Sequence, residues 1–181
     1  MKKTLAIDMD NVIVEIETNW IDLYEKSYGV RIDKADLLGK PEEAAFPDPE
    51  AAWELIIKPG FFRYAPPIDG AVEAIRELQK HFEIYIVSAA MEFPNSLREK
   101  HDWLAEHLPF ISWKNIIFCG DKSVVVTDYL IDDHLKNLDF TKGTPILFTA
   151  SHNVNVQKHT RVNNWQEVLD LFSKDLVEQN N

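Results

Sequence analysis

Short, mostly apolar runs recur along the chain and are separated by longer segments with helical spacing. The runs are residues 4–7, 84–87, 116–119, 129–131 and 146–148. An almost unbroken apolar run of this length is typical of a strand covered on both faces, as in a parallel sheet. Parallel neighbours need crossover connections, which the intervening helices can supply. We therefore predict an α/β fold, a doubly wound parallel sheet between two helical layers.

Helix start signals precede the apolar stripes between these runs. Asp69 is expected to cap one helix, and Ser96 with Glu99 has the pattern of a capping box at the start of another. Asn164 precedes a third apolar stripe near the end of the chain. These signals predict helices on either side of the sheet.

One long segment, residues 15–67, interrupts the alternation of strands and helices. It offers an amphipathic helix around Trp20 and Tyr24, and a second helix that Asp48 would cap and Pro49 would open. We predict that 15–67 is a small helical cap inserted after the first strand, and that 1–14 and 68–181 form the core. Within that core, the last four residues, 178–181, are expected to fray.

Composition and charge exclude several classes of protein. The 181 residues are 45% hydrophobic, which suits one globular domain, and a formal net charge of -11 argues against binding long nucleic acid. Asp8 and Asp10 interrupt the first apolar run before it could form a signal peptide, and no segment has the length of a membrane span. The single cysteine, Cys119, fits a reducing compartment. We expect a cytoplasmic protein with no membrane partner; a homodimer is left open.

Polar side chains stand at or just beyond the ends of four apolar runs. They are Asp8, Asp10, Ser88, Lys122, Asp132 and Asp133. In an open parallel sheet, residues beyond the carboxyl ends of the strands meet in space even when they are far apart in sequence. Two carboxylate pairs, a hydroxyl and an ammonium group would therefore share one edge of the sheet. Such a set outlines a site for phosphate transfer.

The chemistry suggests a role for each group. Asp8 could attack phosphorus, while Asp10 could give and then take a proton. Carboxylates gathered around a phosphate need a cation, and hard oxygen ligands favour Mg²⁺. Lys122 could neutralise Asp8 and hold a phosphoryl oxygen, with Ser88 donating from the other side. Taken singly, Lys122 would usually be a solvated loop residue and Ser88 a turn former, and Asp132 and Asp133 could equally be capping or turn residues. The combination with Asp8 and Asp10 favours the site.

The same residues resemble a known family. Asp8-Met-Asp-Asn-Val12, followed by Ser88, Lys122 and Ile131-Asp-Asp133, resembles the haloacid dehalogenase (HAD) superfamily of aspartyl-phosphate phosphotransferases. More narrowly, three stretches look like the 5'(3')-deoxyribonucleotidases: residues 70–74, 122–133 and 148–153. The matches extend over nearly the whole chain.

The resemblance implies a Rossmann-like core with a helical cap over the active site. It also implies a Mg²⁺-dependent phosphomonoesterase for nucleoside monophosphates. By motif, Asp8 would be the nucleophile and a metal ligand, and Asp10 the acid/base that also offers its backbone carbonyl to the metal. Asp133 would bind the metal directly, with support from Asp132.

Two positions depart from the family pattern. Asn11 stands where glycine is common after the acid/base aspartate, and Ala89 stands where eukaryotic members offer a second hydroxyl. Neither departure removes a group that the chemistry needs.

In that family the cap and the first loop supply an aromatic pocket for the base. The candidates in this chain are Ile16, Trp20, Phe46, Phe61 and Phe62. For Trp20, and likewise for Trp53, filling the core of the cap is an equally good interpretation. Lys100 could either reach a phosphate or face water.

Two other functions stay open. One is a phosphatase for another small metabolite, such as a sugar phosphate, and the other is a nucleotide-sensing protein without turnover. The nucleotide-sensing protein would be expected to have lost a nucleophile, acid/base or metal residue, and none is missing.

His134 and His152 are expected to be inessential. The tryptophans Trp103, Trp113 and Trp165 are expected in the core.

Overall fold

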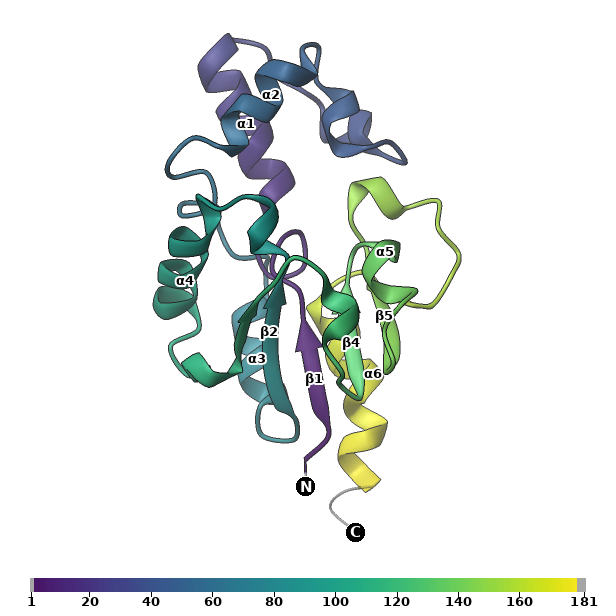
Figure 1. Ribbon diagram of the computed structural model, residues 1–181. Coiled ribbons are helices and arrows are strands. Elements are labelled where there is room, and N and C mark those ends of the chain that lie inside the picture. Colours follow the sequence, from purple (N-terminus) through teal and green to yellow (C-terminus); the bar gives the residue numbers. More distant parts are fainter. Residues whose placement is uncertain (1, 179–181) are drawn as a thin grey trace.

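The computed structural model describes residues 2–178, and a parallel sheet lies at its centre (Figure 1). In spatial order the strands are β3 (Ile116–Phe118), β2 (Glu83–Ser88), β1 (Thr4–Ile7), β4 (Tyr129–Asp132), β5 (Thr144–Phe148) and β6 (Thr160–Val162). Every neighbouring pair is parallel. All five apolar runs contribute a strand, which confirms the predicted fold class. Only β6 was missed, because this short edge strand has no apolar run.

The strand order changes direction at β1. The chain proceeds outward from β1 to β2 and β3, and then returns to place β4, β5 and β6 on the other side. In open α/β sheets, ligands bind at such a switch point, beyond the carboxyl ends of the strands. Asp8, which directly follows β1, therefore stands at the position where this architecture builds binding sites.

Helices cover the two faces unequally. The α-helices are α1 (Ile16–Tyr28), α2 (Pro49–Ile56), α3 (Ala71–Leu78), α4 (Ser96–His107), α5 (Leu135–Leu138) and α6 (Trp165–Glu178). Alternate residues of β1 point to opposite faces: Leu5 and Ile7 join the large core under α3 and α6, while Ala6 joins a smaller cluster with Leu138 of α5. The face near α5 is thus a thin layer of one short helix and loops.

Short 3₁₀ turns complete the connections. They are η1 (Lys34–Leu37), η2 (Glu42–Ala45), η3 (Ala90–Glu92), η4 (Trp113–Asn115), η5 (Lys122–Val124) and η6 (Ser151–Asn153). Several of them follow strands at the carboxyl edge of the sheet, where they deliver the polar residues of the site. None of the described helices is long and apolar enough to cross a bilayer.

The segment between β1 and α3 lies over the carboxyl edge of the sheet (Figure 1). Its helices α1 and α2 pack around Trp20, whose Nε1 donates to the carbonyl of Ala52 at 2.9 Å. Phe46 packs against both Trp20 and Tyr24 with tilted rings, whose centroids lie 4.7 and 5.0 Å away. The division into a core domain and a cap at residues 15–67 stays a prediction.

The cap predicted at Asp48 is confirmed, because Asp48 accepts a hydrogen bond from the amide of Ala51 at 3.1 Å. Asn164, which precedes the predicted last helix, accepts one from the amide of Glu167 at 2.9 Å. The cap expected from Asp69 is wrong, because residue 70 is the N-cap of α3 and no side chain caps that helix.

The capping box expected from Ser96 and Glu99 is also wrong. Helix α4 begins after Asn95 without a side-chain cap, and Ser96 instead donates to the carbonyl of Ala90 at 3.2 Å.

Trp113 was expected in the core but is 75% exposed, since it lies in the turn before the edge strand β3. Residues 179–181 of the expected tail lie outside the described part of the chain.

The turn before β5 depends on a glycine. A Cβ on Gly143 would lie 2.1 Å from the carbonyl oxygen of Thr127 and 2.7 Å from that of Asp128. Both neighbours are backbone atoms, so they cannot rotate away. We predict that Gly143→Ala lowers the free energy of unfolding by about 3 kcal/mol, measured by urea denaturation. Gly120→Ala is the matched control, because its nearest neighbour would lie at an ordinary 3.9 Å; equal stability of the two variants would contradict the prediction.

Candidate active site

A pocket of about 240 Å³ opens between the carboxyl edge of the sheet and the segment above it. Asp8, Asp10 and Lys122 lie at the sheet side of this pocket. Its aromatic and aliphatic wall includes Ile16, Trp20, Trp53, Phe61, Phe62 and Phe93. A charged floor thus meets an apolar wall within one cavity.

The loop after β1 directs its two aspartates by backbone geometry. The amide of Asp8 extends the ladder to β4 by donating to the carbonyl of Ile131 at 3.0 Å. The chain then turns back, and the amide of Ile13 donates to the carbonyl of Met9 at 2.8 Å. Asn11 has a φ of 55°, in the left-handed region that glycine and asparagine tolerate best. This conformation explains why asparagine can stand where the family commonly has glycine.

Lys122 lies between two buried carboxylates. Its Nζ is 2.5 Å from Asp8 Oδ1 and 2.7 Å from Asp132 Oδ2, and its side chain is 2% exposed. Burial alone would lower the pKa of Lys122, but the charges of Asp8 and Asp132 outweigh it and raise that pKa. Asp132 also accepts from Asn137 Nδ2 and from the amide of His134. Both oxygens of Asp132 are therefore used by protein donors.

Asp133 has the opposite environment. Both of its carboxylate oxygens are buried and lack a hydrogen-bond partner in the described part of the protein. Burial, followed by the charges of Asp132 and Asp8, raises the pKa of Asp133 well above its usual value. A buried carboxylate without a partner is costly, and a cation would compensate it. Asp8, Asp132 and Asp133 each offer an oxygen within 4.8 Å of the others, so this acidic cluster could hold a metal ion.

Lys100 faces the site and not the solvent. Its Nζ is 2.5 Å from Asp10 Oδ2 and 3.0 Å from Ser88 Oγ, and it lies 4.6 Å from the ring centroid of Phe62. Its side chain is 3% exposed. The alternative in which Lys100 faces water is therefore wrong. This ammonium group connects the second aspartate of the first loop with the serine that ends β2.

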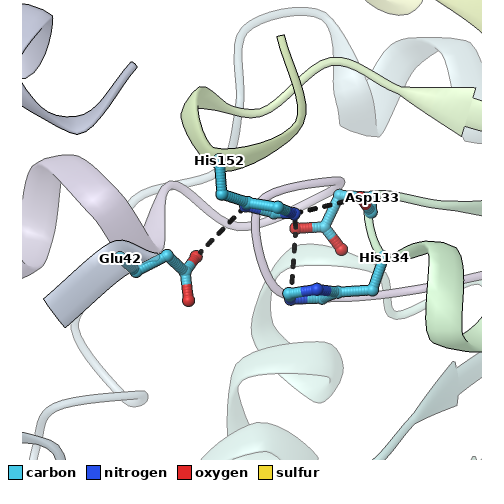
Figure 2. Close-up of side chains that lie close together, drawn as sticks. All are labelled: Glu42, Asp133, His134 and His152. Atoms are coloured by element: carbon cyan, nitrogen blue, oxygen red, sulfur yellow. Dashed lines mark hydrogen bonds and ion pairs between the residues drawn. The ribbon is translucent and has the colours of Figure 1, made fainter. Parts of the chain in front are cut away.

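Two histidines and Glu42 surround the outer side of Asp133 (Figure 2). His152 Nε2 is 3.8 Å from Asp133 Oδ2, and its Nδ1 is 3.7 Å from Glu42 Oε1. The rings of His134 and His152 are stacked, with centroids 4.3 Å apart and planes inclined by 16°. Nitrogen lone pairs lie in the ring plane, so two nearly parallel rings cannot both point at one ion. These four residues have ligand atoms within 4.8 Å of one another, but in this arrangement at most one of the two histidines could bind a given ion.

Burial lowers the pKa of both histidines, that of His134 to about 4. Burial, followed by the charges of Glu17 and Asp10, raises the pKa of Glu42 to about 7. Glu42 was missed by sequence reasoning, since it belongs to a short 3₁₀ turn with no motif around it.

The candidates for the apolar wall are placed differently from one another. Ile16, Trp20, Phe61 and Phe62 line the pocket, whereas Phe46 does not and packs inside the segment above it. Trp20 was expected either to fill the small core of this segment or to line the base pocket. It does both, because its side chain is 3% exposed and also borders the pocket. Trp53 is 41% exposed and stacks on Phe93 with ring centroids 5.6 Å apart. Phe93 was not anticipated, because no motif marks it.

Solved structures with the same fold are haloacid dehalogenase-like proteins. A hydrolase of this type from Streptococcus pneumoniae has a TM-score of 0.63 at 14% identity, covering 94% of this chain and 98% of the other. A HAD family hydrolase from Deinococcus radiodurans, described with bound phosphate and sodium, has a TM-score of 0.61 at 15% identity, covering 97% of each chain. At these identities the likeness shows the fold.

Sequence relatives narrow the assignment. A protein from Staphylococcus aureus is 37% identical over 172 residues, covering 94% of this chain and 96% of that protein. A Bacillus subtilis protein named 5'(3')-deoxyribonucleotidase is 33% identical over 180 residues, covering 93% of this chain and 97% of that protein. The family model described as "5' nucleotidase, deoxy (Pyrimidine), cytosolic type C protein" matches residues 2–178. The chain therefore belongs to this deoxynucleotidase family of the haloacid dehalogenase-like fold.

Proposed function

We propose that the protein is a Mg²⁺-dependent phosphomonoesterase that dephosphorylates deoxynucleoside monophosphates through a phospho-Asp8 intermediate. The observation that carries this proposal is the position of Asp8. Its carboxylate lies 2.5 Å from the Lys122 ammonium, on the floor of a pocket whose wall is aromatic. Membership of the deoxynucleotidase family supports the same reaction.

In the first step, an Asp8 oxygen forms a bond to phosphorus while the bond from phosphorus to the ester oxygen breaks. Asp10 gives its proton to the departing oxygen. In the second step, Asp10 takes a proton from water as that water attacks phosphorus, and phosphate leaves Asp8. Lys100 holds one oxygen of Asp10, whereas Asp10 Oδ1 is buried with no hydrogen-bond partner among residues 2–178, which leaves it able to carry the proton.

Phosphate would be held by groups from three elements. Lys122 and Ser88 keep the roles predicted for them, and we add Lys100, whose Nζ lies 3.0 Å from Ser88 Oγ. Charge-assisted hydrogen bonds of this kind suit an anion in a site with little water. Burial raises the pKa of Asp8, while Lys122 opposes this shift and favours the ionised nucleophile.

The cluster around Asp133 fits a hard cation, because both Asp133 oxygens are buried and have no hydrogen-bond partner within the described part of the chain. Asp8, Asp133 and the backbone carbonyl of Asp10 would hold Mg²⁺, and Asp132 would support the site by fixing Lys122. When bound, Mg²⁺ would neutralise charge on the phosphoryl oxygens and orient them toward Asp8.

The substrate class follows from the pocket wall. Ile16, Trp20, Phe61 and Phe62 could contact a planar base, which a sugar phosphate does not offer. A phosphatase panel of deoxyribonucleotides, ribonucleotides and sugar phosphates tests this assignment. Low activity on dUMP and dTMP relative to sugar phosphates would favour the other substrate class.

The cytoplasmic location stays a prediction, and a homodimer stays open.

The nucleophile can be tested by one isosteric substitution. Asp8→Asn is expected to lower kcat at least about 10³-fold, because an amide cannot form the covalent intermediate. Release of inorganic phosphate from dUMP measures this. Asp170→Asn, the same change on the exposed face of α6, serves as control and should leave kcat unchanged. Retained turnover in Asp8→Asn would refute the mechanism.

The metal site can be tested by stability as well as activity. Without a cation, burial disfavours the ionised form of Asp133 and its oxygens lack a hydrogen-bond partner among the described residues, so the uncharged Asp133→Asn variant should have a higher Tm in the presence of EDTA. Added Mg²⁺ should raise Tm of the wild type but not of Asp133→Asn, since ligands that bind the folded state stabilise it. Calorimetry with and without Mg²⁺ measures both effects. A full Mg²⁺ response in the variant would argue against Asp133 as a ligand.

A further inference from the structure

One carboxylate connects the pocket wall to the core. Glu99 Oε1 accepts from the amide of Gly60 at 2.6 Å, and Glu99 Oε2 accepts from the amides of Phe62 and Arg63, each at 3.1 Å. We call residues 60–63 the wall turn, because Phe61 and Phe62 line the pocket. Three backbone donors of the wall turn thus converge on a single side chain of α4.

This arrangement differs from an ordinary helix start or a surface ion pair. Glu99 lies in the first turn of α4, where a glutamate commonly caps its own helix, yet its partners are more than 35 residues away. Gly60 has a φ of 96°, a conformation that side chains rarely adopt, which turns its amide toward the carboxylate. Converging backbone amides form the kind of concavity that binds anions. Here the protein supplies its own anion.

The wall turn is fixed on its other sides by packing. Phe61 and Phe62 are 2% and 4% exposed. Phe61 meets the edge of Trp20 at 6.2 Å between ring centroids, and Asn19 Nδ2 donates to the carbonyl of Phe61 at 2.9 Å. These contacts hold the wall turn to α1, whereas Glu99 holds it to α4.

The next residue of α4 serves the reaction centre. Lys100 contacts Asp10 and Ser88 and also lies 4.6 Å from the ring centroid of Phe62. Consecutive residues of one helix therefore fix the wall turn and the groups proposed to handle phosphate. The distance between base wall and phosphate site depends on α4.

We propose that Glu99 is a positioning residue that sets this distance and so selects nucleoside monophosphates over small phosphate compounds that lack a base. The proposal rests on the function proposed above. Glu99 does not line the pocket, so it would act through the backbone of the wall turn. A misplaced wall weakens contacts with the base but leaves the chemistry at Asp8 intact.

The test compares two substrates in Glu99→Gln. For dUMP, kcat/KM is expected to fall about tenfold, mainly through KM, because the amide cannot accept from all three backbone donors. For acetyl phosphate, which carries no base, kcat/KM should change less than about twofold. Glu99→Asp, which keeps the charge on a shorter side chain, should recover part of the loss with dUMP.

Glu106→Gln is the matched control. Glu106 lies on the same helix and pairs with the Arg63 side chain, but its own side chain is 53% exposed. An exposed pair of this kind contributes little, so both substrates should behave as in the wild type. The control removes a carboxylate near the same turn without touching its backbone.

The outcomes separate this proposal from the function on which it rests. Equal losses for both substrates, or no loss for either, would overturn the role of Glu99. A wild type that hydrolyses acetyl phosphate but not dUMP would overturn the nucleotide substrate, and one that hydrolyses neither would overturn the phosphatase. Should Glu99→Gln fail to fold, judged by circular dichroism, Glu99→Asp is measured by the same criterion: a loss confined to dUMP supports the proposal, and any other pattern rejects it.

Discussion

The structure depends on a buried ammonium group between two buried carboxylates. Lys122 lies within 2.7 Å of both Asp8 and Asp132, and all three side chains are at most 7% exposed. An acidic residue can follow β1 and another can end the adjacent strand β4 because the loop after β3 delivers this counter-charge. A partner of a buried pair cannot be lost without leaving an uncompensated charge. Asn137 Nδ2 donates to both carboxylate oxygens of Asp132 and so helps to hold this carboxylate in place.

Lys122 does not compensate all the acidic groups of the site. Asp133 adds another buried carboxylate, and the two buried lysines of the site are already engaged: Lys122 with Asp8 and Asp132, and Lys100 with Asp10. A phosphate would add still more negative charge. Under the proposed function, the site would hold two ligands of opposite sign, a hard cation beside Asp133 and an anion near Lys100, and each would compensate the charge that the other brings.

Sequence reasoning succeeded where the backbone alone decides the position. Parallel strand ends converge whatever their loops contain, so Asp8, Ser88 and Asp133 could be brought together from their places after apolar runs. It failed where a side chain's direction depends on how a helix docks. Glu99 carries a local capping pattern, yet its partners lie in the wall turn. Lys100 could not be assigned from sequence for the same reason: its direction follows from the docking of α4.

The reaction centre and the segment above it are joined at two places of different character. On one side, Asn11 accepts from the amide of Glu17 at 3.1 Å and donates to Glu42 at 2.7 Å, so the residue after Asp10 contacts both α1 and η2. A glycine there would satisfy the left-handed backbone but could make neither contact. On the other side, Glu99 and Lys100 join the wall turn to Asp10. One connection ends at Asp10 and the other at the residue directly after it, so a displacement of the segment above the sheet would act more directly on the proposed acid/base than on Asp8, which Lys122 holds.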